Sequence, residues 1–581
     1  MRVSLQFRWT LLLLLSASYV IVSYFPTLLN SFCWDDRAFV LENPLIRDLS
    51  WSGLGRIFTD LRSGYYMPLS ILSYAVEYHF FGTEPVFFHT TNFVLHLANC
   101  GLVLWILWRL VPDRPTAVLA ALLFAVHPAK VEAVAWIAAR KDLLCAFFFF
   151  LSIIFYQGGK RAWTLFFFIL SLMSKTMTVT LPFILILLDR HKKRPFSKKV
   201  GWERALFFSV SICFGSLTVY TQRTIGALGP ETPLVPWNVL MTLVQSLAFY
   251  VYKTLLPLGL SCLYPTEITL GSEIPKLAAI ALFSFMAWRL LDKEAKRLFV
   301  FSVTFFLVTL LPILRFVPLG LMVVADRYTY IPSIGFALAA ALLLRAAASR
   351  LAVRPLSRMT ALALVSCLLA WLSFTTYQRC FVWANEDTLW ADAIKKYPAM
   401  SAPYVNHAVH LNRFGKYKAA IQDLDRAIAL DPASAEAYNN RAYGRLYSGD
   451  KEGALADIQK ALVIKPGFAD AYVNWANLEL SNGKPDQAAL KFAEAIRLAP
   501  NDPQIIYQRA MVFIYQNDLE GAIRDFDRYL LLKPDSVEAL NNRGCLFLQQ
   551  KNYSRASEDF KRALKIRPDY EKAKENLKAV P

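Results

Sequence analysis

Residues 32–46, FCWDDRAFVLENPLI, place two adjacent carboxylates, Asp35 and Asp36, directly after the first strongly apolar segment of the chain, residues 9–29. Charged groups next to a bilayer are costly unless they are paired, solvated or used for chemistry. The acidic pair is therefore the feature around which the rest of the sequence is interpreted. Three parts are predicted: a membrane domain (1–380) that holds the pair outside the bilayer, a linker (381–398) and a repeat domain (399–581).

The chain has 581 residues, of which 56% are hydrophobic and 14% aromatic, and its net charge is +19. This hydrophobic fraction, gathered in long runs, is typical of a membrane protein. The basic residues stand between the apolar runs, as the positive-inside bias produces, rather than in patches on a soluble domain. Composition therefore excludes a nucleic-acid partner from the expectation. The eight cysteines show no CxxC pair, so neither a zinc site nor a disulfide framework is predicted.

Apolar segments of spanning length predict an all-α polytopic bundle of about 11 spans. They lie near residues 9–29, 91–110, 116–136, 142–157, 162–173, 176–189, 204–222, 275–291, 298–316, 329–347 and 358–377. The first is predicted to be an uncleaved span with a cytoplasmic N-terminus, because its apolar run is too long for a signal peptide. The fifth and sixth are short enough to form a hairpin that does not cross fully. Residues 237–257 are predicted to form an interfacial or re-entrant helix.

This span order assigns sides to the loops. The predicted inner loops are residues 109–114, 158–161, 189–204, 292–297 and 345–358, and all of them contain Lys or Arg, as the positive-inside rule requires. The acidic pair, the turns at 138–142 and 173–177, the segment 324–330 and the repeat domain then lie outside the cytoplasm.

Five motifs on the predicted outer face carry groups suited to chemistry: WDD at 34–36, HPAKVE at 127–132, ARKD at 139–142, SKT at 174–176 and ADRY at 325–328. The predicted donor-phosphate contacts are Arg140, Lys141, Lys175 and Arg327. The predicted supporting residues are His89, His127, Glu132, Asp142 and Asp326. The alternative interpretation is that the cations extend to lipid headgroups or pair with the neighbouring acids.

Asp35 and Asp36 are both predicted as catalytic residues. Adjacent residues of an extended loop point to opposite sides, so at most one of them faces a substrate directly, and the other orients the loop or ligates a metal. A partly desolvated carboxylate has a raised pKa, which suits a base that takes a proton from a hydroxyl. The sequence leaves open which of the two is the base and whether a divalent ion takes part. The alternative is a solvated pair that caps residues 38–41.

Prolines recur every 34 residues after the apolar part, which is the period of tetratricopeptide (TPR) repeats. They are Pro398, Pro432, Pro466, Pro500, Pro534 and Pro568. Small residues keep the same step, and these are Ala420, Ala454, Ala488, Ala522 and Ala556. Five repeats that stack into an α-solenoid are predicted, with residues 570–580 as a capping helix.

A polar column has the same period in the first helix of each repeat: Asn406, Asn440, Asn474, Gln508 and Asn542. A carboxamide both donates to and accepts from a peptide backbone, so this column predicts a groove for an extended polypeptide acceptor. The alternative is that these residues only pack the repeats together.

Four motifs in order carry a family resemblance: FxWDDxxxxxxNPLI at 32–46, HPAKVEAVAWIAARKDLL at 127–144, SLMSKTMTVTLPFILILLD at 171–189 and ADRYTYIPSIG at 325–335. Followed by TPR repeats, they resemble the transmembrane and TPR protein O-mannosyltransferases and their bacterial relatives. The resemblance implies a GT-C type inverting glycosyltransferase. Its donor would be a polyprenyl-phosphate sugar, and its acceptor a Ser or Thr hydroxyl outside the cytoplasm. Asp35 and Asp36 fall on the family's acidic motif, and Arg140, Lys141 and Asp142 on its second charged turn.

Two other functions are weighed against this one: a non-catalytic TPR scaffold for an envelope complex, and a GT-C transferase that acts on a glycan or lipid. The charged outer motifs favour an enzyme, and the groove favours a polypeptide acceptor. The expected location is a bacterial inner membrane with the TPR domain in the periplasm. The alternative location is the endoplasmic reticulum membrane with the TPR domain in the lumen.

Overall fold

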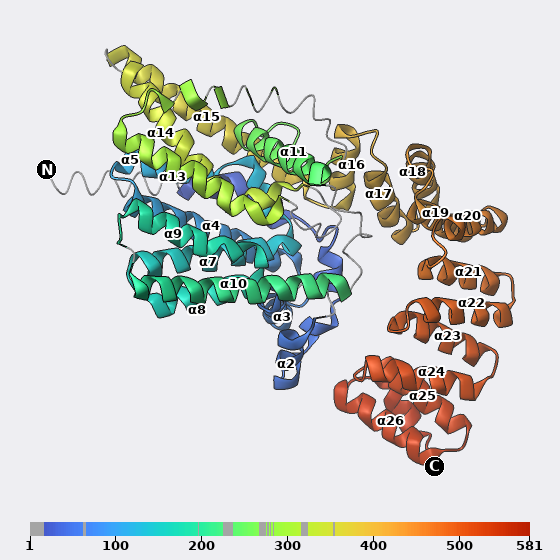
Figure 1. Cartoon of the computed structure of the whole chain (residues 1–581). Coiled ribbons are helices and arrows are strands. Elements are labelled where there is room, and N and C mark those ends of the chain that lie inside the picture. Colours follow the sequence, from blue (N-terminus) through green and yellow to red (C-terminus); the bar gives the residue numbers. More distant parts are fainter. Residues whose placement is uncertain are drawn as a thin grey trace. The chain divides into compact units, whose positions relative to one another are not determined.

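The computed structural model describes most of the chain, and the described residues form helices joined by turns, with no strand among them (Figure 1). They are residues 17–61, 66–195, 197–224, 236–265, 275, 278, 281–282, 284–286, 288–314, 324–351 and 355–581. The chain divides into two compact units, Met1–Tyr397 and Pro398–Pro581. The predicted all-α class, an apolar bundle followed by helical repeats, is confirmed.

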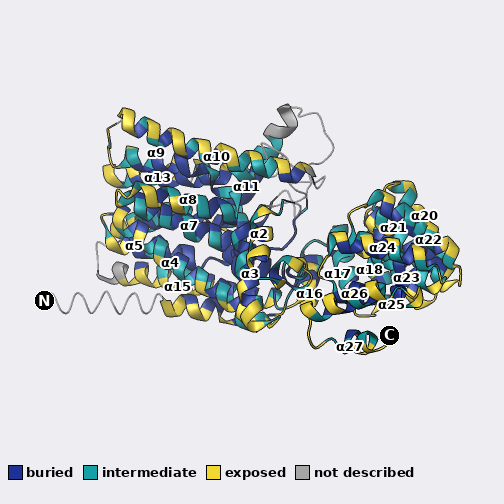
Figure 2. Cartoon of the chain, turned by 90° about the horizontal axis from the view of Figure 1, so that it is seen from below, coloured by how far each residue is buried: buried dark blue, intermediate teal, exposed yellow. Residues whose placement is uncertain are grey.

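Five helices of the first unit are long and apolar enough to cross a membrane, judged by length and composition. They are α4 (Pro85–Leu110), α10 (Lys198–Thr224), α13 (Lys293–Leu310), α14 (Ser333–Leu351) and α15 (Pro355–Val382). Exposed residues lie along the length of α10 and α15 (Figure 2). Some of them are apolar: the side chain of Ile212 is 67% exposed and that of Leu362 is 70% exposed. Long rows of exposed apolar side chains are unfavourable in water but are covered by lipid tails in a bilayer. The first unit is therefore built as a membrane protein.

The segment predicted as a single span at 116–136 is broken near its middle. α5 (Arg114–Ala125) ends before Pro128, and the chain continues through η4 (Pro128–Lys130) and α6 (Val131–Ala135) at an angle of 54°. Proline lacks an N–H group and disfavours a helical conformation at the residue before it, which ends α5. If the bent pair is one span, the described residues contain six spans.

Five or six helices of spanning length are fewer than the predicted number of about 11. Other predicted spans correspond to shorter or more polar helices: α7 (Arg140–Gln157), α8 (Arg161–Ser174) and α9 (Leu181–His191). α7 begins with three charged residues, and the 3₁₀ helix η6 (Thr176–Thr180) separates α8 from α9. Residues 1–16, which hold part of the first predicted span, lie outside the described residues, as does much of the span predicted at 275–291. The predicted interfacial helix at 237–257 is α11 (Pro236–Leu255).

Loops from opposite ends of the helices form two separate groups. In one group, Arg297 donates to the carbonyl of Arg190 (3.3 Å), which joins the last turn of α9 to the start of α13. In the other, the Asp36 carboxylate accepts a hydrogen bond from the Ala138 N–H (2.7 Å). Both contacts join loops that the predicted span order puts on the same face.

The acidic segment lies in a packed layer of short elements between the first apolar helix and α4. These elements are η2 (Arg37–Leu41), η3 (Pro44–Arg47), α2 (Trp51–Thr59) and α3 (Pro68–Phe81). The Asn43 side chain accepts from the Leu45 N–H (3.0 Å) where η3 begins. Val40, Ile46 and Ile137 are almost fully buried in one apolar cluster that these elements share. The loop that carries Asp35 and Asp36 is therefore anchored by a hydrophobic core.

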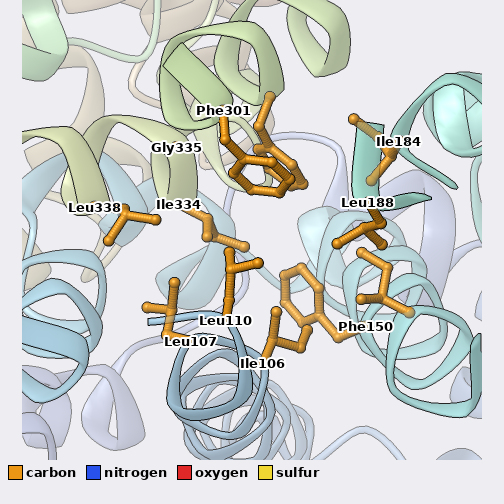
Figure 3. Close-up of a pocket in the computed structure, with 12 residues that line it drawn as sticks. Ile106, Leu107, Leu110, Phe150, Ile184, Leu188, Phe301, Ile334, Gly335 and Leu338 are labelled. Carbon is orange, nitrogen blue, oxygen red and sulfur yellow. The ribbon is translucent and has the colours of Figure 1, made fainter. Parts of the chain in front are cut away.

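A small apolar cavity lies among α4, α7, α9, α13 and α14 (Figure 3). Aliphatic and aromatic side chains line it, among them Ile106, Phe150 and Leu338. Its volume is about 20 Å³, and such a space holds about one water molecule. We interpret it as a packing gap, because it is too small and too apolar for a substrate.

Residues 381–398, predicted as a linker, are mostly helical, and all of them except Pro398 belong to the first unit. They contain the end of α15 and a further helix, α16 (Glu386–Lys396). Asn385 begins α16 with a capping box, in which its side chain accepts from the Thr388 N–H (2.9 Å). Trp390 on this helix is 1% exposed. Because α16 has only 11 residues and several charges, its sequence gave no clear apolar period.

The second unit consists of five helix pairs and a final single helix, as the 34-residue period predicts. The pairs are α17 (Ser401–Arg413) with α18 (Tyr417–Leu430), α19 (Ala435–Ser448) with α20 (Lys451–Ile464), α21 (Ala469–Ser481) with α22 (Pro485–Leu498), α23 (Pro503–Tyr515) with α24 (Leu519–Leu532), and α25 (Val537–Gln549) with α26 (Tyr553–Ile566). The last helix is α27 (Glu571–Lys578). The periodic alanines, Ala420, Ala454, Ala488, Ala522 and Ala556, are all 0% exposed, because each lies where two helices approach closely.

Candidate active site

Asp36 is fully buried, and backbone groups hold both of its carboxyl oxygens. Oδ2 accepts from the Cys33 N–H (3.0 Å) within the same loop, and Oδ1 accepts from the Ala138 N–H (2.7 Å) in η5 (Ile137–Ala139). Burial raises the pKa of Asp36 to about 8, while the backbone N–H donors oppose that rise. Asp36 therefore fastens the acidic loop to the turn that precedes α7.

Asp35 lies in a different environment. Its side chain is partly exposed, and no hydrogen bond to its carboxylate is found among the described residues. Burial raises the pKa of Asp35, and the nearby charges of Lys141 and Arg327 work against that rise. The result is an uncommitted carboxylate that faces two cations, which is the arrangement expected of a base and a site for an anion.

Trp34 directly precedes the two carboxylates and has an unusual backbone conformation. Its φ is +53°, a left-handed conformation that is costly for a bulky residue. Its ring stacks on Trp136 (centroids 4.8 Å apart) and meets the edge of Trp390 (5.4 Å). These aromatic contacts offset the backbone strain. They also hold α16 and the residue that precedes η5 against the acidic loop.

Three of the four predicted phosphate-binding cations gather around two aromatic rings near Asp35. Lys141 and Arg327 lie over Trp136 at 5.9 and 5.1 Å, and Lys175 and Arg327 lie over Tyr328 at 5.0 and 4.8 Å. The structure thus brings together charges from α7, the end of α8 and η8 (Asp326–Thr329). Sequence reasoning missed both aromatic residues, because an aromatic ring beside a membrane has no distinctive pattern.

Two of the predicted supporting acids hold these cations. Glu132 pairs with the Arg327 guanidinium, and its Oε2 also accepts the Arg327 backbone N–H (2.9 Å). Asp142 accepts from the Lys175 ammonium (2.6 Å). Buried ion pairs of this kind fix the position of a charge, because breaking one leaves an uncompensated charge in a low-dielectric region.

Arg140, the fourth predicted cation, is bound elsewhere. It is 0% exposed; its Nε donates to the Asn92 side chain (2.8 Å), and its terminal nitrogens donate to the Phe88 carbonyl (2.7 Å) and pair with Glu77. Arg140 therefore braces α3, α4 and the start of α7. Glu77 was missed by sequence reasoning, although a single acid in the apolar helix 68–81 is a signal for such a buried partner.

His89, His127 and Asp326 also lie outside the group around Asp35. The His89 ring contacts the Ser31 carbonyl (3.4 Å), and the His127 ring contacts the Thr254 carbonyl (2.9 Å). Asp326 accepts from Tyr264 (2.5 Å) and from Arg379 (2.9 Å). Although Asp326 and Arg327 are neighbours, their side chains thus bind different partners. Arg379 and Tyr264 were not singled out from the sequence.

The polar column of the second unit is not uniform. Asn474 donates to the Asn439 side chain (2.8 Å), and Asn542 donates to the Tyr507 hydroxyl (2.9 Å), so both amides join neighbouring repeats. The Oε1 atom of Gln508 is buried without a hydrogen-bond partner. Asn406 and Asn440 are half-buried, and no side-chain hydrogen bond is found for them in the described part of the chain.

Within the described ranges, no group of three or more His, Cys, Asp and Glu side chains is placed to hold a metal ion.

Comparison with known families identifies the repeats. Family models described as tetratricopeptide repeat match residues 439–503 and 537–570, and one described as TPR repeat matches residues 414–446. Among solved structures, YrrB, a TPR protein with an unusual peptide-binding site, is 23% identical. It covers 32% of this chain and 97% of its own, with a TM-score of 0.27.

The curated relatives are named protein O-mannosyl-transferases. The Xenopus laevis protein tmtc2 is 34% identical over 152 residues, which are 25% of this chain and 18% of that protein. The Caenorhabditis elegans protein F38B6.6 is 25% identical over 446 residues, which are 73% of this chain and 63% of that protein. The chain therefore aligns with less than two thirds of the length of either relative. The chain is thus similar in sequence to proteins named protein O-mannosyl-transferases, and it carries TPR repeats.

Proposed function

We propose that the chain is an inverting GT-C type glycosyltransferase that moves a sugar, mannose by similarity to the named relatives, from a polyprenyl-phosphate donor to Ser or Thr hydroxyls of proteins. The observation that carries the proposal is the contrast between the two acidic residues. Both carboxyl oxygens of Asp36 accept backbone hydrogen bonds. The Asp35 carboxylate accepts none among the described residues and faces Lys141 and Arg327. A scaffold has no need for a partly exposed carboxylate held beside two cations.

In this proposal Asp35 is the general base. Its carboxylate takes the proton of the acceptor hydroxyl while the hydroxyl oxygen forms a bond with the anomeric carbon of the sugar. The bond between that carbon and the phosphate oxygen breaks, and the polyprenyl phosphate leaves with the electron pair. Attack from the side opposite the leaving group inverts the anomeric centre. Positioned proton transfer of this kind contributes about 10²–10⁴-fold to a rate.

Arg327, Lys141 and Lys175 are proposed to stabilise the leaving phosphate. Negative charge grows on that group in the transition state, and preorganised cations there lower the barrier. Glu132 and Asp142 hold Arg327 and Lys175 in place through the ion pairs described above. Arg140 contributes by keeping the start of α7, and so the adjacent Lys141, in position.

The second unit is proposed to present the acceptor polypeptide. The half-buried amides of Asn406 and Asn440 are able to bind an extended backbone, since their side chains are not bonded within the described fold. Asn474 and Asn542 keep the repeats in register instead.

The positive-inside bias supports an orientation in which the acidic loop faces away from the cytoplasm. The last turns of α4 and α9 carry Arg109 and Arg190, and Lys192 follows α9, whereas the opposite end carries the acidic pair. We therefore propose a bacterial inner membrane as the location, with Asp35 and the TPR unit on the periplasmic side. The endoplasmic reticulum membrane is the alternative compartment with the same orientation.

The test in cells compares the glycans of extracytoplasmic proteins from cells that carry the wild-type chain or the Asp35→Asn variant. Membrane insertion and protein level are measured for both. Hexose on Ser or Thr is expected to disappear in the variant, and the lost sites identify the acceptors. An unchanged glycan profile at equal protein level overturns the proposal.

A further inference from the structure

A cavity of about 240 Å³ lies beside the last turns of α15, next to Asp326 rather than next to the group around Asp35. Its polar lining comes from Thr375, Gln378, Arg379 and Lys396. All four can donate hydrogen bonds, and no acidic residue is among the described residues that line the cavity. The cavity therefore has the hydrogen-bonding character of an anion site.

Two of these lining residues are cations that point at the same carbonyl. Arg379 is 6% exposed and donates to the Leu260 carbonyl (2.6 Å), and the Lys396 ammonium donates to the same oxygen (2.6 Å). Asp326 binds Arg379 (2.9 Å), and Asp392 binds Lys396 (2.6 Å). The Nε of Arg379 is buried without a hydrogen-bond partner.

A third cation approaches the same loop from α11. Lys253 donates to the carbonyls of Leu258 (2.7 Å) and Gly259 (3.1 Å). Gly259 has a φ of +59°, which glycine adopts without strain, and this turn presents successive carbonyls to the three cations. Among the described residues, Asp326 pairs with Arg379 and Asp392 pairs with Lys396, and the carbonyls add acceptors that carry no net charge. Burial and the charge of Arg379 lower the pKa of Lys396, as expected where positive charges crowd.

The position of the cavity indicates which anion it meets. α15 is a candidate membrane span whose apolar window ends at Val382, one of the residues that line the cavity. On the same helix, Phe374 and Phe381 are 61% and 44% exposed, which fits contact with lipid tails. A basic cavity at the end of a span lies at the level of the headgroups, where phosphate is the abundant anion.

We propose that this cavity binds the headgroup phosphate of a bilayer phospholipid, at a site separate from the group around Asp35. Lys396, Gln378 and Arg379 donate to the phosphate oxygens, and the acyl chains run along the exposed face of α15. This inference does not depend on the transferase activity, so its test does not measure transfer.

The test uses the full-length protein in detergent and measures its thermal stabilisation by dihexanoyl phosphatidylglycerol. The matched variants are Lys396→Gln and Lys395→Gln, which remove the same charge from neighbouring positions of α16; Lys395 is exposed and does not line the cavity. The wild type and Lys395→Gln are expected to bind equally. Lys396→Gln is expected to bind about fivefold more weakly, the effect of roughly one basic residue near a membrane surface.

Three further probes decide the source of the phosphate. Dihexanoylglycerol, which lacks phosphate, and inorganic phosphate are expected to give no stabilisation at the same concentration. Equal binding by Lys396→Gln, equal stabilisation by either of these probes, or displacement by a polyprenyl phosphate at far lower concentration overturns the proposal. If Lys396→Gln does not fold, Gln378→Glu replaces it, because it puts a negative charge into the cavity from an exposed position; binding as tight as in the wild type then overturns the proposal.

Discussion

The carboxyl groups of Asp35 and Asp36 belong to consecutive residues but meet different partners. Asp36 accepts the N–H groups of Cys33 and Ala138, whereas Asp35 faces the charges of Lys141 and Arg327. The left-handed turn at Trp34 precedes this divergence and is held by stacking on Trp136. The account that follows from this geometry gives Asp36 a positioning role and Asp35 the role of the base.

Replacing Asp36 is expected to destabilise the fold. In Asp36→Asn the amide nitrogen cannot accept, so one of the two backbone N–H groups loses its partner, at a cost of about 1–3 kcal/mol. A fall in the melting temperature of the purified protein checks this expectation. Asp35→Asn is the matched control and is expected to melt as the wild type does. If Asp36→Asn keeps its melting temperature but loses all transfer, the two roles have been assigned the wrong way round.

Arg140 and Lys141 are neighbours with the same charge, but their substitution is expected to change different properties, stability for Arg140 and activity for Lys141. Arg140→Gln leaves the buried Glu77 unpaired, so a loss of about 3–5 kcal/mol in unfolding free energy is expected. Lys141→Gln removes a cation from the phosphate site, and a fall in kcat of about 10²-fold or more is expected with little change in melting temperature. Melting curves and transfer rates for both variants check this pair. Equal effects of both variants on stability contradict the assignment.

The pH dependence of transfer is expected to follow the ionisation of Asp35. A base acts when it is deprotonated, and burial raises the pKa of Asp35, so activity should rise with pH above the usual carboxyl range of about 4. The charge of Lys141 lowers this pKa, and Lys141→Gln should therefore move the acidic limb to higher pH. Profiles of kcat/KM against pH for both proteins check the sign. A limb that stays in place or moves to lower pH rules out Asp35 as the titrating base.

The polar column of the repeats is expected to divide into two classes. Asn474→Ala removes the hydrogen bond to Asn439 and should lower the melting temperature of the repeat unit within the full chain. Asn440→Ala removes an amide that is not bonded within the described fold, so it should raise the KM for an acceptor polypeptide and leave stability unchanged. Calorimetry and transfer kinetics separate the two effects. If Asn474→Ala instead raises the KM and Asn440→Ala lowers the melting temperature, Asn474 rather than Asn440 contacts the acceptor.

The repeat unit could be predicted almost completely, because its 34-residue period fixes every helix pair by local pattern. The membrane unit could be predicted less well. The break near Pro128 lies inside a predicted span. α16 lies in the predicted linker, because a charged helix of 11 residues shows no strong apolar period.

In the candidate site, the tertiary partners of the charged residues could not be predicted from the sequence. Of the four predicted phosphate-binding cations, Lys141, Lys175 and Arg327 lie around Trp136 and Tyr328. Arg140 has the same charge and lies in the same motif, yet tertiary contacts send it to Glu77. Nor does any sequence pattern show that Asp36 would accept a backbone N–H from a turn 102 residues away.

The most direct test of Asp35 as the base is the transfer of mannose from a polyprenyl-phosphate donor to an acceptor polypeptide by the purified full-length protein. Wild type and Asp35→Asn are compared after both are shown to have the same melting temperature. The account predicts a fall in kcat of about 10²–10⁴-fold with an unchanged KM for the donor. Transfer by Asp35→Asn within about threefold of the wild type, measured at the same folded concentration, would contradict it.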